Sequence, residues 1–144
     1  MQLVEIKALT ADGYERTAHV FLIDLDKSVW CHFIQHDEYL EAGQESVKLK
    51  TGDRVEGSFS IQLVNGYTLQ GDAEAPGFKQ PIEESSHIVA VCEVREIIDE
   101  YSCLCDIGLL GEEVTVEFED SVTVEPGAII TIRGSLEFDP EPAS

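Results

Sequence analysis

The sequence predicts an all-β protein that folds as two small antiparallel β-barrel units with at most one short helix. Three observations support this prediction. Apolar and polar residues alternate with a period of two over much of the chain, which is typical of strands with one buried and one solvent-facing side. Turn-forming pairs that contain glycine separate the alternating segments. A short pattern from the first half returns in the second half, which indicates two related units.

The alternation is clearest in residues 55–63, 114–119 and 129–138. On the buried face we expect Val55, Gly57, Phe59, Ile61 and Leu63 of the first segment, Val114, Val116 and Phe118 of the second, and Ile130, Ile132, Leu136 and Phe138 of the third. On the solvent-facing side we expect Glu56, Ser58, Ser60, Gln62, Thr115, Glu117, Glu119, Thr131, Arg133, Ser135 and Glu137. Each segment therefore predicts a strand with one wet face.

Further strands are predicted at residues 3–9, 17–25, 28–35, 67–70, 88–97 and 101–106. Turns are expected at Asp12-Gly13, Asn65-Gly66, Gly71-Asp72 and Pro126-Gly127. Asn65-Gly66 is the strongest hairpin signal, because this pair suits the two-residue turn between antiparallel strands. Asp24 and Asp26 are interpreted as turn residues between two strands.

Two segments lack the alternation. Residues 37–46 suit either a loop or one short helix, because acidic residues near the start favour a helix N-terminus. Residues 71–86 contain glycine, proline and acidic residues without periodicity, which indicates a loop or linker. The predicted organisation is therefore an N-terminal domain at 1–72, a linker at 73–86, a C-terminal domain at 87–140 and a tail at 141–144.

An internal repeat supports this division. The segment VKLKTGDRVEG, residues 47–57, aligns with VTVEPGAIITIRG, residues 122–134, when the second copy contains two extra residues. Both copies begin with alternating residues, turn at a glycine and enter an apolar strand that ends in glycine.

The phrase LKTGDRVEGSFS resembles the glycine–aspartate turn and late strand of OB-type barrels, the small five-stranded barrels that hold oligonucleotides or serve as protein adaptors. The second half is similar to such a barrel in its long strand IVAVCEVREII, its hairpin and its final segment PGAIITIRGSLEF. The resemblance implies tandem OB-like modules. It implies no particular activity, because one fold carries many functions.

The charge of the chain points to a basic partner. The sequence has 29 acidic residues against 9 lysines and arginines, a formal net charge of -20. Up to Ser86 there are 15 acidic and 7 basic residues, a net -8, and from His87 onward 14 and 2, a net -12. Such a surface repels nucleic acid and anionic lipid and attracts basic proteins. Nucleic-acid binding would also need a basic groove with stacking aromatic residues.

The acidic residues after His87 gather near one predicted hairpin and the turn before it. The candidate partner-binding residues are Glu96, Asp99, Glu100, Glu112, Glu113, Glu117, Glu119 and Asp120. Like charges on one face lower stability, so a chain that keeps them can be keeping them for a basic partner. The alternative is an outer face whose charges are screened by water and salt.

The stretch WCHFIQH suggests a second kind of site around Cys31, His32 and His36, to which Cys103 and Cys105 could contribute. On a straight strand the two histidines lie too far apart for one metal ion, and C-x-C differs from the spacing of a zinc knuckle. The sequence also lacks the phosphate-loop, nucleophile-elbow and zinc-protease motifs. We therefore predict no catalytic residues, no metal and no cofactor, and an enzyme of unfamiliar type stays an alternative.

The four cysteines lie in apolar segments of a chain that begins without an export signal, so we expect reduced thiols and a cytoplasmic location. Together these features predict an acidic protein–protein interaction module that binds a basic partner protein. An immunity or inhibitor protein that neutralises a nuclease-type toxin, or an adaptor, would have these properties. The alternatives are a metal-binding protein or enzyme at the Cys/His site, and a structural subunit of a larger β assembly.

Overall fold

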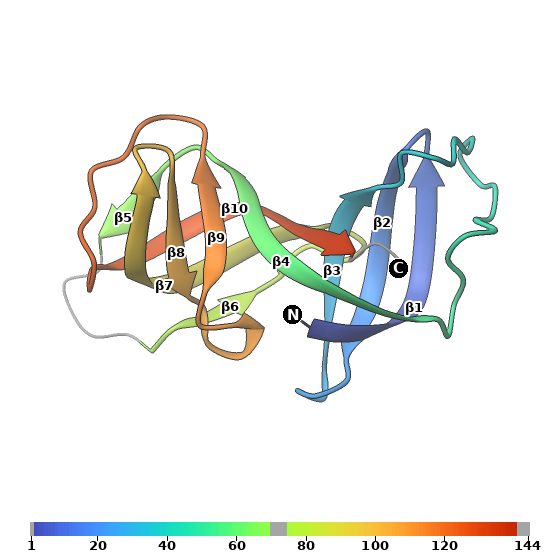
Figure 1. The fold of residues 1–144 in the computed structure, drawn as a ribbon, viewed down its shortest axis with the longest axis horizontal. Helices are drawn as coiled ribbons and strands as arrows, with labels where there is room; N and C mark the ends of the chain where they lie inside the picture. Colours follow the sequence, from blue (N-terminus) through green and yellow to red (C-terminus); the bar gives the residue numbers. More distant parts are fainter. Residues whose placement is uncertain (1, 70–74, 141–144) are drawn as a thin grey trace.

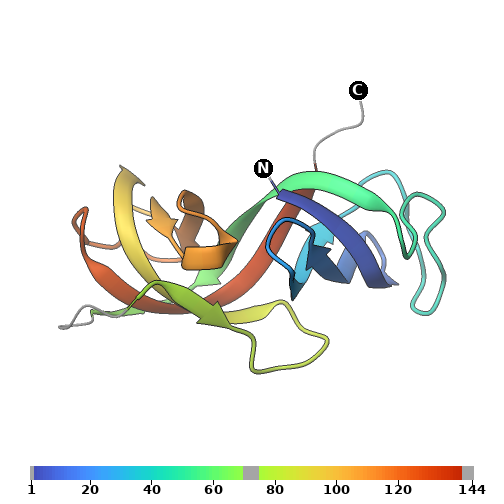
Figure 2. The ribbon, with the colours of Figure 1, turned by 90° about the horizontal axis from the view of Figure 1, so that it is seen from below.

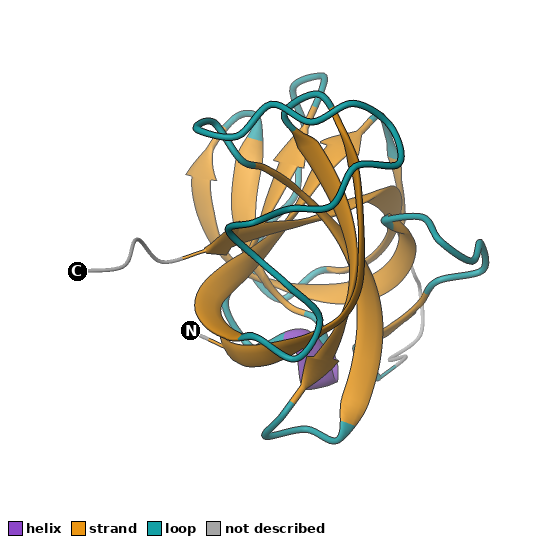
Figure 3. Ribbon diagram, turned by 90° about the vertical axis from the view of Figure 1, so that its right-hand side faces the viewer, coloured by secondary structure: helices purple, strands orange, loops and turns teal. Residues whose placement is uncertain are grey.

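The computed structural model describes residues 2–69 and 75–140, and within this part of the chain the protein is all-β, as predicted (Figure 3). The elements are β1 Gln2–Asp12, β2 Glu15–Leu22, β3 Lys27–Ile34, β4 Arg54–Val64, β5 Tyr67–Leu69, β6 Gly77–Lys79, β7 His87–Asp99, β8 Ser102–Asp106, the 3-10 helix η1 Gly108–Leu110, β9 Val114–Phe118 and β10 Ile129–Pro140. Among the described residues, no helix has the length and apolar character needed to cross a bilayer.

The strands form one ten-stranded sheet in the order β5-β10-β3-β2-β1-β4-β9-β8-β7-β6. Figure 1 shows β1, β2 and β3 at one end of the molecule and β7, β8 and β9 at the other, with β4 and β10 running between them. Additional pairings of β10 with β4 and β7 make the sheet close on itself twice. One circuit is β1-β2-β3-β10-β4 and the other is β7-β8-β9-β4-β10.

Both circuits use β4 and β10, so the sheet is continuous through the two ends of the molecule (Figure 2). The two separate barrel units that the sequence predicted are therefore not confirmed. Residues 75–86 of the predicted linker include β6, which pairs with β7 along Gly77–Lys79. The division into domains at 1–72 and 87–140 and the likeness to OB-type barrels stay predictions, and the Gly71-Asp72 turn and the tail at 141–144 lie outside the described residues.

The internal repeat corresponds to two matching turns. Gly52 donates its N–H to the carbonyl of Ile6 on β1 at 2.7 Å, and Gly127 donates to the carbonyl of Val94 on β7 at the same distance. Both glycines have positive φ, 95° and 93°, which glycine adopts at little cost. In each copy the strand residue, Ile6 or Val94, donates back at 2.9 Å to the residue that follows the glycine. The two turns therefore start the long strands in equivalent positions: β4 begins beside β1, and β10 begins beside β7.

The core follows the predicted alternation closely in two of the three clearest segments. Val114, Val116 and Phe118 of β9 are buried, as are Ile130, Ile132, Leu136 and Phe138 of β10. In β4 the pattern holds through Ile61 and then shifts: Leu63 is 64% exposed and Val64 is buried. The prediction that Leu63 faces the core was wrong, because a β-bulge between Ile61 and Val64 places Leu63 at φ 60° and turns its side chain outward.

One further local prediction was wrong, and the choice between loop and short helix that the sequence left open at residues 37–46 is resolved. Asn65-Gly66 connects β4 to β5, yet no pairing joins these strands among the described residues, and β5 pairs with β10 instead. Residues 37–46 form a loop, because the backbone and side chain of Glu38 are drawn inward to Arg16 and Leu40 pairs with Gly13. The turn between β2 and β3 holds Asp24 and Asp26 as predicted, with Asp26 at φ 51°.

Candidate functional site

The largest hollow described is a groove of about 460 Å³, which we call the central groove. Its polar lining comes from four strands and two loops: Ser58, Ser60 and Gln62 of β4, Thr115 and Glu117 of β9 with Glu113 just before it, Glu137 and Asp139 of β10, and His32 of β3 with His36 just after it. Apolar residues at its edges are Phe33, Ile34, Phe59, Phe138 and Pro140.

Strand register explains why these side chains gather. Ser60 on β4 is the partner of Glu137 on β10 to one side and of Thr115 on β9 to the other. Glu137 is in turn the partner of His32 on β3. Directly paired residues project from the same face of a sheet. The polar sides of four strands therefore form one continuous row across the molecule.

The central groove is strongly acidic. Glu113, Glu117, Glu137 and Asp139 place four carboxylates in its lining, and among the described residues no lysine or arginine lines it. His32 and His36 are its basic groups, and His36 is exposed. A groove lined in this way has a negative potential that the surrounding low-dielectric protein focuses.

His32 lies between two carboxylates in the central groove. Its Nδ1 is 2.8 Å and 3.0 Å from the two carboxylate oxygens of Glu137, and its Nε2 is 3.2 Å from Oε1 of Glu15 on β2. The hydrogen bond to Glu137 is the main cause that raises the pKa of His32 above its ordinary value, and partial burial opposes it. Glu137 also accepts a hydrogen bond from Ser135 at 3.1 Å.

All eight acidic residues predicted to bind a partner are exposed. Glu113 and Glu117 line the central groove, whereas Glu96, Glu100, Glu112 and Asp120 do not. In the described part of the chain none of the eight forms an ion pair within the protein. Apart from Asp99, whose carboxylate accepts hydrogen bonds within its own turn, these charges are left for solvent or a partner. Sequence reasoning missed Asp139 and the role of Glu137, although it placed Glu137 on a solvent-facing side.

A second hollow of about 340 Å³ adjoins the central groove and shares Gln62 and Glu117 with it. Asp99, Glu119 and Glu117 supply its carboxylates, and Leu63 and Tyr101 are exposed apolar residues in its lining. Asp99 also has a structural task. Its carboxylate accepts hydrogen bonds from Tyr101 N at 2.8 Å and Ser102 Oγ at 2.9 Å, and these bonds lower its pKa.

The residues of the predicted Cys/His site are divided between the core and the groove. Cys31, Cys103 and Cys105 are buried in the core, and the sulfurs of the latter two lie 3.4 Å apart. His32 and His36 line the central groove on the other side of β3. Within residues 2–69 and 75–140, no group of three or more His, Cys, Asp or Glu side chains is arranged to hold a metal ion.

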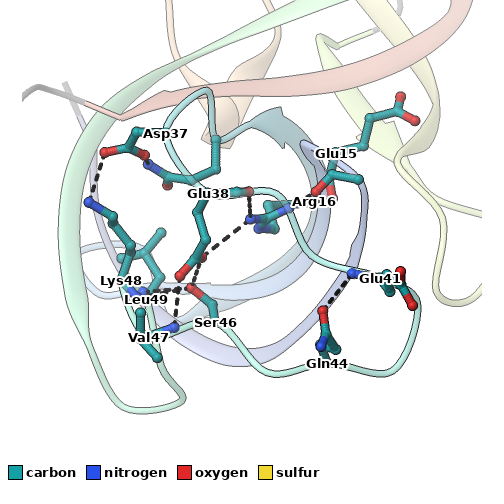
Figure 4. A network of polar contacts seen from close by, with 12 residues as sticks. Glu15, Arg16, Asp37, Glu38, Glu41, Gln44, Ser46, Val47, Lys48 and Leu49 are labelled. Atoms are coloured by element: carbon teal, nitrogen blue, oxygen red, sulfur yellow. Dashed lines mark hydrogen bonds and ion pairs between the residues drawn. The ribbon is translucent and has the colours of Figure 1, made fainter.

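A buried polar network between β2 and the loop that follows β3 was not predicted (Figure 4). Arg16 is 1% exposed, and its guanidinium donates to the carbonyl of Glu38 at 2.6 Å and to its Oε1 at 3.2 Å. Ser46 and the N–H of Val47 also donate to the Glu38 carboxylate. The network holds the loop between β3 and β4 and has a structural role. The sequence signal was the position of Arg16, which shares the buried side of β2 with Ala18 and Val20.

No protein-family model, curated protein or solved structure matches the chain.

Proposed function

We propose that the protein is an acidic interaction module that binds a basic partner protein in the central groove. The observation that carries this proposal is the row of paired residues from His32 through Glu137 and Ser60 to Thr115. Along this row the groove holds the four carboxylates of Glu113, Glu117, Glu137 and Asp139, and no lysine or arginine among its described lining residues. Arginine or lysine side chains of a partner would find carboxylate acceptors on two opposite strands of the groove, β9 and β10.

The hydroxyl and amide groups of β4 support this proposal. Ser58, Ser60 and Gln62 offer donors and acceptors between the acidic strands, so a bound polypeptide could keep its polar backbone satisfied while its basic side chains meet the carboxylates. A phosphate backbone would meet repulsion from the same carboxylates. An inhibitor or immunity protein that covers the basic surface of a nuclease-type toxin would use such a groove, and so would an adaptor.

The competing interpretation is an acidic face that only interacts with water and salt. It predicts that any pair of acidic residues on the surface contributes equally to attraction of a basic ligand. The proposal predicts that Glu113 and Glu117 contribute more than acidic residues elsewhere, because they lie in one groove with Glu137 and Asp139.

Binding of a fluorescent oligo-arginine peptide, followed by polarisation at low salt, distinguishes the two. The test variant is the double substitution Glu113→Gln with Glu117→Gln. The matched control is Glu41→Gln with Glu83→Gln, which removes the same charge from exposed residues outside the groove. We expect the test variant to bind at least about tenfold more weakly than the wild type, at about 0.7 kcal/mol for each lost charge contact. Equal losses in the two variants would contradict a localised site.

The two alternative functions have less support. A metal-binding protein or enzyme with a Cys/His site around Cys31, His32 and His36 would need the buried Cys31 to turn toward the groove. A structural subunit would pair through the strands at the ends of the sheet order, and β5 and β6 are three residues each. Metal analysis of the purified protein and light scattering test these alternatives directly.

A further inference from the structure

The pairing of β3 with β10 closes the first circuit of strands, and it has fewer residue pairs than any other pairing in that circuit. Its ladder consists of one parallel pair, Glu137 with His32. By comparison, β10 pairs with β4 over five residue pairs and β2 pairs with β3 over eight. The side chains of the one pair are joined as well, through the imidazole of His32 and the carboxylate of Glu137 at 2.8 Å. This position therefore carries the backbone pairing and the polar side-chain link between β3 and β10, while on the core face the rings of Phe33 and Phe138 also meet at 6.4 Å between centroids.

The ring of His32 contacts carboxylates on both sides. Nδ1 faces Glu137 on β10 and Nε2 faces Glu15 on β2. A neutral imidazole has one N–H and one lone pair, so it can donate to only one of two carboxylates. The lone pair on the other nitrogen would then face a carboxylate oxygen. The imidazolium form, with two N–H donors, is the form that satisfies this geometry.

The surroundings of His32 add to this preference. His32 and Glu137 are each 19% exposed at their side chains, and Glu15 is 68% exposed. The same groove is lined by Glu113 just before β9, Glu117 on β9, Asp139 on β10 and His36. Ser135 donates to Glu137 and is itself bonded to Ser86 at 2.7 Å, which fixes the carboxylate in place. No lysine or arginine lines the groove to take the place of the imidazolium.

We propose that His32 is a proton-operated clasp. Its protonated ring joins β2, β3 and β10 and neutralises part of the negative charge of the central groove, whereas loss of the proton loosens the link between these strands and makes the groove more negatively charged. The second half of this statement rests on the proposed function, because it concerns attraction of a basic partner. The first half concerns the fold alone and holds or fails independently.

The direction of the pH effect follows from the protonated form. A histidine whose pKa is raised in the folded protein contributes stability that is fully present below its unfolded pKa, about 6.5. This contribution is lost as the pH rises through the raised folded pKa of His32. On deprotonation the ring keeps one carboxylate, and Glu15, the more exposed and more distant of the two, is the one we expect to be released.

The clasp is tested by NMR titration of the histidine rings in the intact protein and by urea unfolding across about pH 5.5 to 8.5. The variants are His32→Gln and, as a matched control in the same groove, His36→Gln. We expect His32 to titrate above its ordinary range, and the stability difference between wild type and His32→Gln to shrink as the pH rises. The His36→Gln variant keeps His32 between its two carboxylates and serves as the control. A titration of His32 at or below the ordinary value would overturn the proposal, and this measurement uses the wild-type protein even if His32→Gln does not fold.

The effect on the groove is tested with the oligo-arginine peptide, whose amino terminus is blocked by the label, so that only its guanidinium groups carry positive charge and these stay protonated over this pH range. We expect the wild type to bind about threefold more tightly at the upper end of the range, since one exposed charge contact has an effect of this order. This pH dependence should be weaker in His32→Gln than in His36→Gln, which keeps the clasp. Binding that occurs without any pH dependence would refute the clasp's influence on the groove and leave the interaction module standing. No binding at any pH would refute the module, while the NMR and unfolding results would still decide the clasp.

Discussion

Gly57 of β4 and Gly134 of β10 occupy matching positions near the two ends of the stretch over which these strands pair. Gly57 ends the first copy of the internal repeat and Gly134 ends the second. A Cβ atom on Gly134 would lie 2.6 Å from the carbonyl oxygen of Gln62, and one on Gly57 would collide with the carbonyl oxygen of Asp139 and the ring of Phe138. Each strand approaches the backbone of the other so closely that only glycine fits, and this approach lets β4 and β10 serve both ends of the molecule.

Replacement of either of these glycines by alanine should destabilise the protein. We expect Gly134→Ala to lower the free energy of unfolding by about 1–3 kcal/mol, because the methyl group would overlap with Gln62 O and with side-chain methyls of Ile61 and Val64. Gly66→Ala is the control, since nothing lies within 4 Å of a Cβ at that position. Urea unfolding followed by circular dichroism measures both. Equal stability of the two variants would show that β4 and β10 do not approach each other this closely.

The network around Arg16 should hold the β3–β4 loop against the sheet. Arg16→Met keeps much of the apolar stem and removes the donors to Glu38 and Gly13. We expect the melting temperature to fall by roughly 5 °C or more, because buried acceptors lose their partners. Hydrogen exchange at the amides of Val47 and Leu49 should quicken, since both depend on the position of Glu38 or Ser46. Lys50→Met, on an exposed side chain of the same loop, provides the control.

The same network predicts a contribution to acid stability. Hydrogen bonds from Ser46, Val47 and Arg16, of which the Ser46 bond has the largest effect, lower the pKa of Glu38 below its ordinary value. A lowered carboxyl pKa gives stability that is present above the unfolded pKa, about 4.3, and is lost as the pH falls through the folded pKa. The stability difference between wild type and Glu38→Gln should therefore shrink as the pH falls below about 4.3. A difference that grows on acidification would contradict the network.

The four cysteines should be unreactive in the folded protein. All four are buried, and burial raises the pKa of Cys31 to about 12, while the pKa of Cys103 is raised further by its hydrogen bond with Cys105. Since the thiolate is the reactive form, a thiol reagent such as dithionitrobenzoate at neutral pH should titrate none of them in native buffer and all four in denaturant. Rapid reaction of even one thiol in native buffer would show that its strand opens.

Leu63 should be replaceable with a gain in stability. Its φ of 60° is unfavourable for a bulky residue and its side chain is 64% exposed, so little burial compensates for the strain. We expect Leu63→Asn to raise the free energy of unfolding by about 0.5–1 kcal/mol, because asparagine adopts this conformation more readily. Ile98→Asn, at an exposed apolar residue without positive φ, is the control and should show no such gain. A loss of stability in Leu63→Asn would indicate a packing role for Leu63.

Some features of the groove could be predicted from local pattern, and others could not. Ser60, Thr115 and Glu137 were each assigned to the wet side of a strand, because the pleat places alternate side chains on opposite faces wherever the strand lies. That the three are neighbours depends on the pairing of β4 with both β9 and β10. Pairing partners lie far apart in the chain, and alternation alone does not select among strands of similar pattern. The assignment of Leu63 was wrong for a related reason, since a bulge reverses the alternation without a mark in the residue pattern.

The sequence by itself determined that this chain forms alternating strands, that its second half is the more acidic, and that two glycine turns repeat. These properties follow from side-chain period, formal charge and the backbone freedom of glycine, all of which act locally. Only the tertiary structure decided that β4 and β10 are shared by both circuits, that Arg16 lies inside, and that His32 meets Glu137 across a single strand pair. Those outcomes depend on which distant segments pair and pack together, and the arrangement of lowest free energy for the whole sheet determines this pairing.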